Sequence, residues 1–72
     1  MTEIPSIDIS LNGHDEQIPA QQSLAALLQL LSIGSDRVAI EMDRQIVHKR
    51  DWANTIVNAG AQIEIVEFVG GG

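Results

Sequence analysis

The chain has 72 residues, of which 44% are hydrophobic, and this composition predicts one small globular domain rather than a disordered segment. It contains no cysteine, which excludes disulfides, iron–sulfur clusters, cysteine–zinc sites and a cysteine nucleophile. Ten acidic side chains outnumber four basic ones, so a basic protein is a more suitable partner than nucleic acid.

The first predicted elements form a β-hairpin. Apolar and polar residues alternate over 7–11, which is the period of a strand with one buried face. Asn12-Gly13 follows, and this pair favours a tight type I′ turn because both residues accept positive φ. A second and weaker strand is predicted to run through about Ile18.

A helix is predicted after the hairpin. Ser23 is a suitable N-cap, since its hydroxyl can accept a hydrogen bond from an unpaired backbone N–H of the first turn. Gly34 is the expected end of the helix. Leucines spaced as i, i+3, i+4 and i+7 form one stripe that should supply most of the core: Leu24, Leu27, Leu28 and Leu31.

Three more strands are predicted in the second half of the chain. Alternation predicts strands over 38–42 and 46–48, separated by a turn at 43–45. The last strand follows a turn at Gly60 and covers residues 63–68.

A short helical turn is predicted between the fourth and fifth strands. Asp51 is expected to cap this turn, which contains Trp52. We expect Trp52 to fill one end of the small core.

The predicted order, β-β-α-β-β-β, is that of an α+β protein with the β-grasp or ubiquitin-like fold. In this fold one main helix lies across one face of a mixed sheet of four to five strands, and the first and last strands pair in parallel at its centre. We therefore expect residues 1–69 to form the domain and residues 70–72 to be a flexible glycine tail. No apolar run reaches the roughly 20 residues that span a bilayer, and Met1-Thr2-Glu3 is not a basic leader, so a cytoplasmic protein without membrane contact is expected.

Few side chains of this sequence suggest catalysis. His14 and His48 have no acid or nucleophile at a recognisable spacing, and we expect both to be solvated surface residues. Neither a catalytic triad nor a metal site is predicted, and no bound cofactor is expected.

The sequence ends in three consecutive glycines, Gly70, Gly71 and Gly72. A terminal carboxylate is anionic at neutral pH and a poor electrophile, so it accepts sulfur or an amine only after activation, for example as a mixed anhydride with AMP. Glycines pass a narrow channel into a closed active site because they lack a Cβ and accept any φ. The functional interpretation is that the Gly72 carboxylate reacts; the alternatives are a frayed terminus or a cloning scar.

The last strand predicts a partner surface beside this tail. Alternation turns the isoleucines of the strand toward the core and puts Glu64, Val66 and Phe68 on the opposite face. Together with Val69, the apolar residues would form a small patch that docks on partners, while Glu64 and Glu67 supply complementary charge. The alternative is that Phe68 folds back onto the core.

Several segments carry a resemblance to a known family: Val38-Ala39-Ile40-Glu41, Ile46-Val47, Arg50-Asp51-Trp52, Gly60 and residues 63–72. With the helix after Ser23 and the Asn12-Gly13 turn, essentially the whole chain resembles the sulfur carrier proteins of thiamine biosynthesis (ThiS). The most specific part is the acidic and apolar strand that runs into Phe-Val-Gly-Gly-Gly. Two turns depart from the family: Ala61 rather than Asp follows Gly60, and the loop directly after the third strand, at Glu41-Met42-Asp43, lacks the Asn that the family often has there.

The resemblance implies a carrier that acts as a co-substrate and not as an enzyme. An E1-like adenylyltransferase would use ATP and Mg to form an acyl-adenylate on Gly72. Sulfur that comes ultimately from a cysteine desulfurase would then replace AMP and leave a Gly72 thiocarboxylate. Thiazole synthase would use this sulfur to form thiazole phosphate.

Other proteins with the same tail chemistry are open alternatives. The small subunit of molybdopterin synthase usually has a proline-containing stretch before Ala-Gly-Gly, and that stretch is absent here. A sulfur carrier for tRNA thiolation and a ubiquitin-like modifier that forms isopeptide bonds would both use a terminal glycine in the same way.

Overall fold

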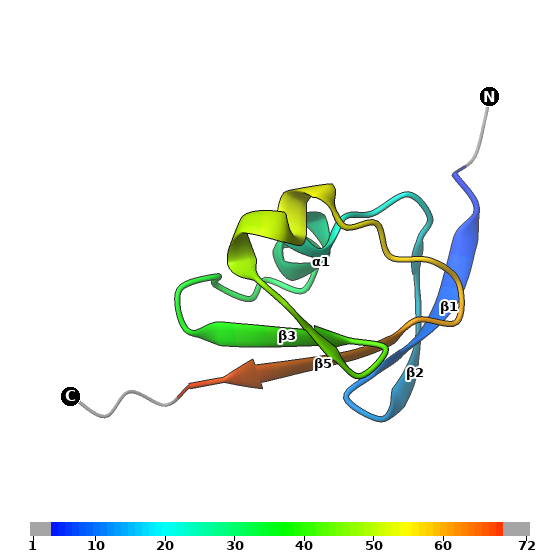
Figure 1. Cartoon of the computed structure of the whole chain (residues 1–72). Helices are drawn as coiled ribbons and strands as arrows, with labels where there is room; N and C mark the ends of the chain where they lie inside the picture. The colour runs from blue at the N-terminus through cyan, green and yellow to red at the C-terminus, as the bar shows by residue number, and fades with distance from the viewer. Residues whose placement is uncertain (1–3, 69–72) are drawn as a thin grey trace.

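The computed structural model describes residues 4–68, and in this part of the chain five strands form one mixed sheet in the order β2-β1-β5-β3-β4. The elements are β1 (Ser6–Leu11), β2 (His14–Pro19), α1 (Leu24–Leu30), β3 (Val38–Met42), β4 (Gln45–Val47), the 3-10 helix η1 (Lys49–Asn54) and β5 (Gln62–Glu67). Both helices lie on the same face of the sheet (Figure 1). Neither of them has the length and apolar character that a membrane crossing needs.

The β1–β2 hairpin forms as predicted. Asn12 and Gly13 have φ angles of 50° and 82°, so both turn residues adopt the left-handed conformation of a type I′ turn. In β2, Ile18 is buried and the four residues before it are exposed, which is the pattern expected of an edge strand.

Strand β5, which leads to the end of the chain, lies at the centre of the sheet. It pairs in parallel with β1, where Leu11 is opposite Ile63, and this confirms the arrangement expected of a β-grasp fold. On its other side it pairs antiparallel with β3 as far as Glu67, which is opposite Val38. Strands on both sides therefore fix the position of β5.

Helix α1 ends earlier than predicted. The left-handed residue that ends it is Ser32, with a φ of 59°, and not Gly34. The N–H groups of Ser32 and Ile33 donate to the carbonyls of Gln29 and Leu28 at 3.0 and 2.9 Å, which is the pattern of a Schellman motif. Ile33 then packs against the core, so the chain turns back before it reaches the glycine.

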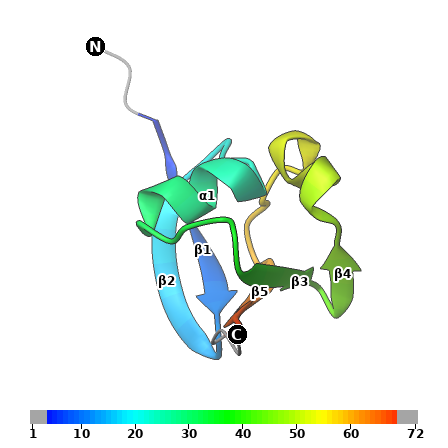
Figure 2. The same cartoon turned by 90° about the vertical axis from the view of Figure 1, so that its left-hand side faces the viewer.

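The core lies between the sheet and the two helices, with α1 above β1 and β2 and η1 above β3 and β4 (Figure 2). The N–H of Ala26 donates to Oγ of Ser23 at 3.0 Å, which confirms the predicted N-cap of α1. Leu31 is only half-buried, because α1 ends before it. The buried residues are Ile9, Ile18, Leu24, Leu27, Leu28, Val38, Ile40, Trp52, Val57, Ala61 and Ile63.

The segment around Trp52 is a 3-10 helix rather than a turn capped by Asp51. The helix begins at Lys49 and its N-cap residue His48 makes no side-chain hydrogen bond to it, so Asp51 lies inside the helix instead of capping it. Strand β4 accordingly ends at Val47, one residue earlier than predicted. Trp52 is buried, as predicted, and its Nε1 donates to the carbonyl of Val47 at 2.8 Å.

Candidate functional site

The structure defines the base of the predicted tail. Val69, Gly70, Gly71 and Gly72 lie outside the described residues. The last described residue is Phe68, and its N–H donates to the carbonyl of Arg37 at 2.7 Å. This hydrogen bond continues the β3–β5 ladder past the last residue of the strand, so the chain is held by the sheet up to Phe68.

The exposed face of β5 carries three of the residues predicted to contact a partner: Glu64, Val66 and Phe68. Ile63 is buried, whereas the side chains of Val66 and Phe68 are 55% and 58% exposed. Glu64 is exposed on the same face. The alternative in which Phe68 folds back onto the core is therefore wrong. Glu67 is exposed too, but alternation puts it on the opposite face of β5, where it lines another hollow with Asp36 and Arg37, so the prediction that it joins this surface is wrong.

A shallow hollow of about 200 Å³ joins these residues to the two neighbouring strands. It lies on the face of the sheet that is turned away from the helices. Its lining comes from β3, β4 and β5 and from the residue that follows β5: Ala39, Ile40, Glu41, Ile46, Glu64, Val66 and Phe68. The predicted surface is therefore wider than the last strand.

Strand register explains why these side chains meet. Ile46 lies opposite Glu41, and Glu41 lies opposite Glu64, so the three form one row across β4, β3 and β5. Val66 and Phe68 follow Glu64 on the same face at the two-residue period of a strand. We call Glu41, Ile46, Glu64, Val66 and Phe68 the outer-face patch.

Sequence reasoning missed Ile46 and Glu41. Ile46 is 69% exposed, more than any other large apolar side chain in residues 4–68. The signal that reveals it is the turn between β3 and β4, where Asp43 and Arg44 have φ angles of 51° and 70°. A two-residue turn of this kind fixes the register, which brings Ile46 beside Glu41.

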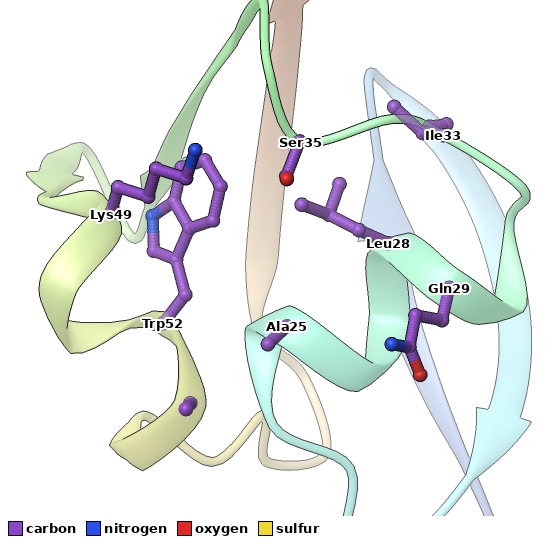
Figure 3. Close-up of a pocket in the computed structure, with 8 residues that line it drawn as sticks. Ala25, Leu28, Gln29, Ile33, Ser35, Lys49 and Trp52 are labelled. Atoms are coloured by element: carbon purple, nitrogen blue, oxygen red, sulfur yellow. The ribbon is translucent and has the colours of Figure 1, made fainter.

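A second hollow, of about 350 Å³, lies on the helical side of the sheet between α1 and η1. In Figure 3, Lys49 and Trp52 form one wall, and Ala25, Leu28 and Gln29 of α1 form the other. Ser35 also lines this hollow, but among the described residues no hydrogen bond joins its hydroxyl to Lys49, so the lining shows no nucleophile paired with a base.

The histidines and carboxylates of the described chain form no reactive centre. His14 and His48 are both exposed, as predicted. Within residues 4–68, His, Asp and Glu side chains form no group of three or more that could hold a metal ion. The outer-face patch beside the tail is therefore the candidate site, and what it offers is a docking surface.

Sequence comparison relates the chain to proteins named for thiazole synthesis. A model of the ThiS family matches residues 8–72. Thiazole synthases of Paramagnetospirillum magneticum and Magnetococcus marinus are 40% and 33% identical to the chain over 62 and 64 residues, which cover 86% and 89% of it. The chain spans only about a fifth of the length of these two proteins, 19% and 20%.

Two further comparisons cover nearly the whole of both chains. The ycf40 protein of Porphyra purpurea is 34% identical over 67 residues, which is 93% of this chain and 94% of that protein. The crystal structure of the thiamine biosynthesis protein ThiS from Geobacter metallireducens superposes with a TM-score of 0.80 at 22% identity, covering 92% of this chain and 100% of the other. That structural likeness confirms the β-grasp fold. Because the family model matches residues 8–72, the chain belongs to the ThiS family.

Proposed function

We propose that this chain is a sulfur carrier of thiamine biosynthesis and that the terminal carboxylate of Gly72 carries the sulfur. The observation on which the proposal rests is the ThiS family match, which runs from residue 8 through the glycines to Gly72. In this role the chain is a co-substrate of other enzymes. The folded domain is the part that partners recognise, and the tail is the part that reacts.

The chemistry of the tail takes two steps. An oxygen of the Gly72 carboxylate attacks the α-phosphorus of ATP, and pyrophosphate leaves to give an acyl-adenylate. An E1-like adenylyltransferase, with Mg bound to the phosphates, would catalyse this step. A sulfur nucleophile then attacks the carbonyl carbon and expels AMP. Sulfur thereby replaces one oxygen of the original carboxylate, and the product is a thiocarboxylate. When that nucleophile is a persulfide supplied by a cysteine desulfurase, a second thiol must cleave the S–S bond.

The outer-face patch is proposed as the surface that the adenylating enzyme binds. Phe68 precedes Gly72 by four residues, which span at most about 14 Å when extended. An enzyme that holds Val66 and Phe68 therefore keeps the carboxylate within reach of its active site. Glu64 and Glu41 give this surface a negative rim, which favours a basic partner. Val69 would extend the apolar surface toward the tail.

Thiazole synthase is proposed as the protein that receives the sulfur. Two thiazole synthases contain a segment similar to this chain, so their polypeptides combine that named activity with a ThiS-like sequence. This combination supports a partnership between the two components. It favours thiamine over molybdopterin or tRNA thiolation as the destination of the sulfur.

Pyrophosphate release by the E1-like enzyme of the same cell tests the first step. The full chain should stimulate ATP-dependent pyrophosphate release, and a chain that lacks Gly71 and Gly72 should not. A chain that lacks Thr2 and Glu3 is a matched control, because it loses as many residues at the other end. Equal stimulation by all three chains would contradict a reactive Gly72. Transfer of the sulfur to thiazole synthase, but not to molybdopterin synthase, would confirm the destination.

A further inference from the structure

Two turn residues form hydrogen bonds with the backbone of β5 through their side chains, each at a different point of the strand. In the β1–β2 turn, Oδ1 of Asn12 accepts from the N–H of Ile65 at 2.8 Å, and Nδ2 of Asn12 donates to the carbonyl of Ile65 at 3.3 Å. In the β3–β4 turn, Oδ1 of Asp43 accepts from the N–H of Gln62 at 2.9 Å. The N–H of Asp43 donates to the carbonyl of Gln62 at 2.8 Å.

The Asn12 contact extends the centre of the sheet toward the tail. The parallel register of β1 and β5 ends where Leu11 lies opposite Ile63, and the N–H of Asn12 donates to the carbonyl of Ile63 at 2.8 Å. Beyond that point β1 turns away into the hairpin. A carboxamide has both a donor and an acceptor, as a peptide group does, so the Asn12 side chain replaces the missing strand at Ile65.

Beyond Ile65, the described part of β5 is paired with a strand only on its β3 side. Within residues 4–68, Asn12 therefore makes the last hydrogen bond that β5 receives from the β1 side. Ile65 precedes Gly72 by seven residues, whereas Gln62, which Asp43 contacts, precedes it by ten. The outer-face residues Val66 and Phe68 come directly after the Asn12 contact.

We propose that Asn12 is a positioning residue for the tail: by holding Ile65 from the β1 side, it fixes the direction in which β5 leaves the sheet. The proposal rests on the proposed function in one respect, namely that partner enzymes receive the chain by its C-terminal end. When the carboxamide is lost, the end of β5 samples more orientations. A smaller fraction of the carrier molecules then presents the outer-face patch and the tail in the arrangement that the adenylating enzyme binds. A smaller competent fraction weakens apparent affinity for the enzyme without changing the chemical step.

Asn12→Gly is the informative variant. Glycine accepts the φ of 50° at this position, so the hairpin turn is retained while both side-chain hydrogen bonds are lost. Asp43→Gly is its matched control, because Asp43 occupies the same place in a two-residue turn with a φ of 51°. That variant also loses a side-chain hydrogen bond to β5, but at the start of the strand.

Amide hydrogen exchange followed by NMR tests the hold on β5 directly. Asn12→Gly should raise the exchange rate of the Ile65 N–H by roughly tenfold, the effect expected from one lost hydrogen bond, and leave Gln62 close to its wild-type rate. Asp43→Gly should raise the exchange rate of the Gln62 N–H and leave that of Ile65 close to its wild-type rate. An unchanged rate at Ile65 in Asn12→Gly would overturn the proposal, as would equal rate increases throughout β5 in both variants.

Carrier-dependent pyrophosphate release tests whether loss of the Asn12 side chain weakens the apparent affinity of the adenylating enzyme for the carrier. We expect Asn12→Gly to raise the KM for the carrier by about fivefold to tenfold with kcat unchanged, and Asp43→Gly to retain the wild-type KM. Equal KM values for the two variants would contradict a positioning role and leave only a contribution to stability. If the wild-type chain does not stimulate pyrophosphate release by the enzyme, the proposed function fails, and exchange at Ile65 still decides whether Asn12 holds the strand.

Discussion

Glu41 and Glu64 lie directly opposite each other on β3 and β5, and both line the hollow of the outer-face patch. Like charges at opposed positions of an antiparallel pair destabilise a sheet. Between residues 4 and 68 the structure has one ion pair, Arg50 with Asp51, so neither glutamate has a cationic partner there. The chain thus keeps a repulsive pair at the surface proposed to bind a basic enzyme.

Glu64→Gln should stabilise the fold and weaken docking. Removing the repulsion raises the free energy of unfolding by about 0.2–1 kcal/mol, which urea unfolding measures. Association with the adenylating enzyme should become slower, and the difference should shrink as salt is added. Glu16→Gln, at an exposed position of β2, makes the same change of charge away from the patch. An equal loss of association rate in both variants would show that only net charge matters.

Phe68→Ala should impair transfer of sulfur without unfolding the domain. The side chain is 58% exposed, so its truncation should change the free energy of unfolding by less than about 1 kcal/mol. The KM of the adenylating enzyme for the carrier should rise, because a docking contact is lost. Leu30→Ala, a 51% exposed position on α1, controls for loss of an exposed apolar side chain. Normal KM values for Phe68→Ala would remove Phe68 from the docking surface.

Ile46→Ala separates docking by the patch from recognition of the tail alone. Ile46 is remote from Gly72 in sequence but lies in the hollow with Val66 and Phe68. If the enzyme binds the patch, the KM for Ile46→Ala rises while kcat stays constant. Ile56→Ala, at a 47% exposed position in the segment between η1 and β5, should leave KM unchanged. If the KM for Ile46→Ala equals the wild-type KM, the enzyme contacts only the last residues of the chain.

Trp52→Phe should destabilise the domain and leave docking intact. The substitution removes the Nε1 hydrogen bond to the carbonyl of Val47 and leaves space in the core, at a cost of about 1–3 kcal/mol. Far-ultraviolet circular dichroism must follow the urea transition, because the variant lacks the only tryptophan. At low temperature, where the variant is folded, its KM for the adenylating enzyme should equal that of the wild type. A raised KM there would place η1 in the docking surface.

The sequence predicts the elements well where a local pattern decides them. The two-residue period, the Asn12-Gly13 turn and the Ser23 cap are confirmed, and three of the four leucines in the predicted stripe are buried. The end of α1 was predicted wrongly because packing of Ile33 selects Ser32 over the glycine as the left-handed residue.

The parts of the site that sequence reasoning missed depend on register or on distant contacts. Ile46 joins the patch only because the β3–β4 turn sets it opposite Glu41. Asn12 contacts a residue 53 positions away, so its role as a turn residue gives no sign of its bonds to Ile65. Contacts of this kind follow from the sheet topology and not from local sequence.

The mass of the intact chain, measured after incubation with ATP, a sulfur source and the E1-like enzyme of the same cell, shows whether Gly72 has gained sulfur. If Gly72 carries the sulfur, the mass rises by the exchange of one oxygen for one sulfur, and the gain is located in the C-terminal peptide that contains Gly72. An unchanged mass, with the enzyme shown to be active on another carrier, would contradict the claim that Gly72 carries sulfur.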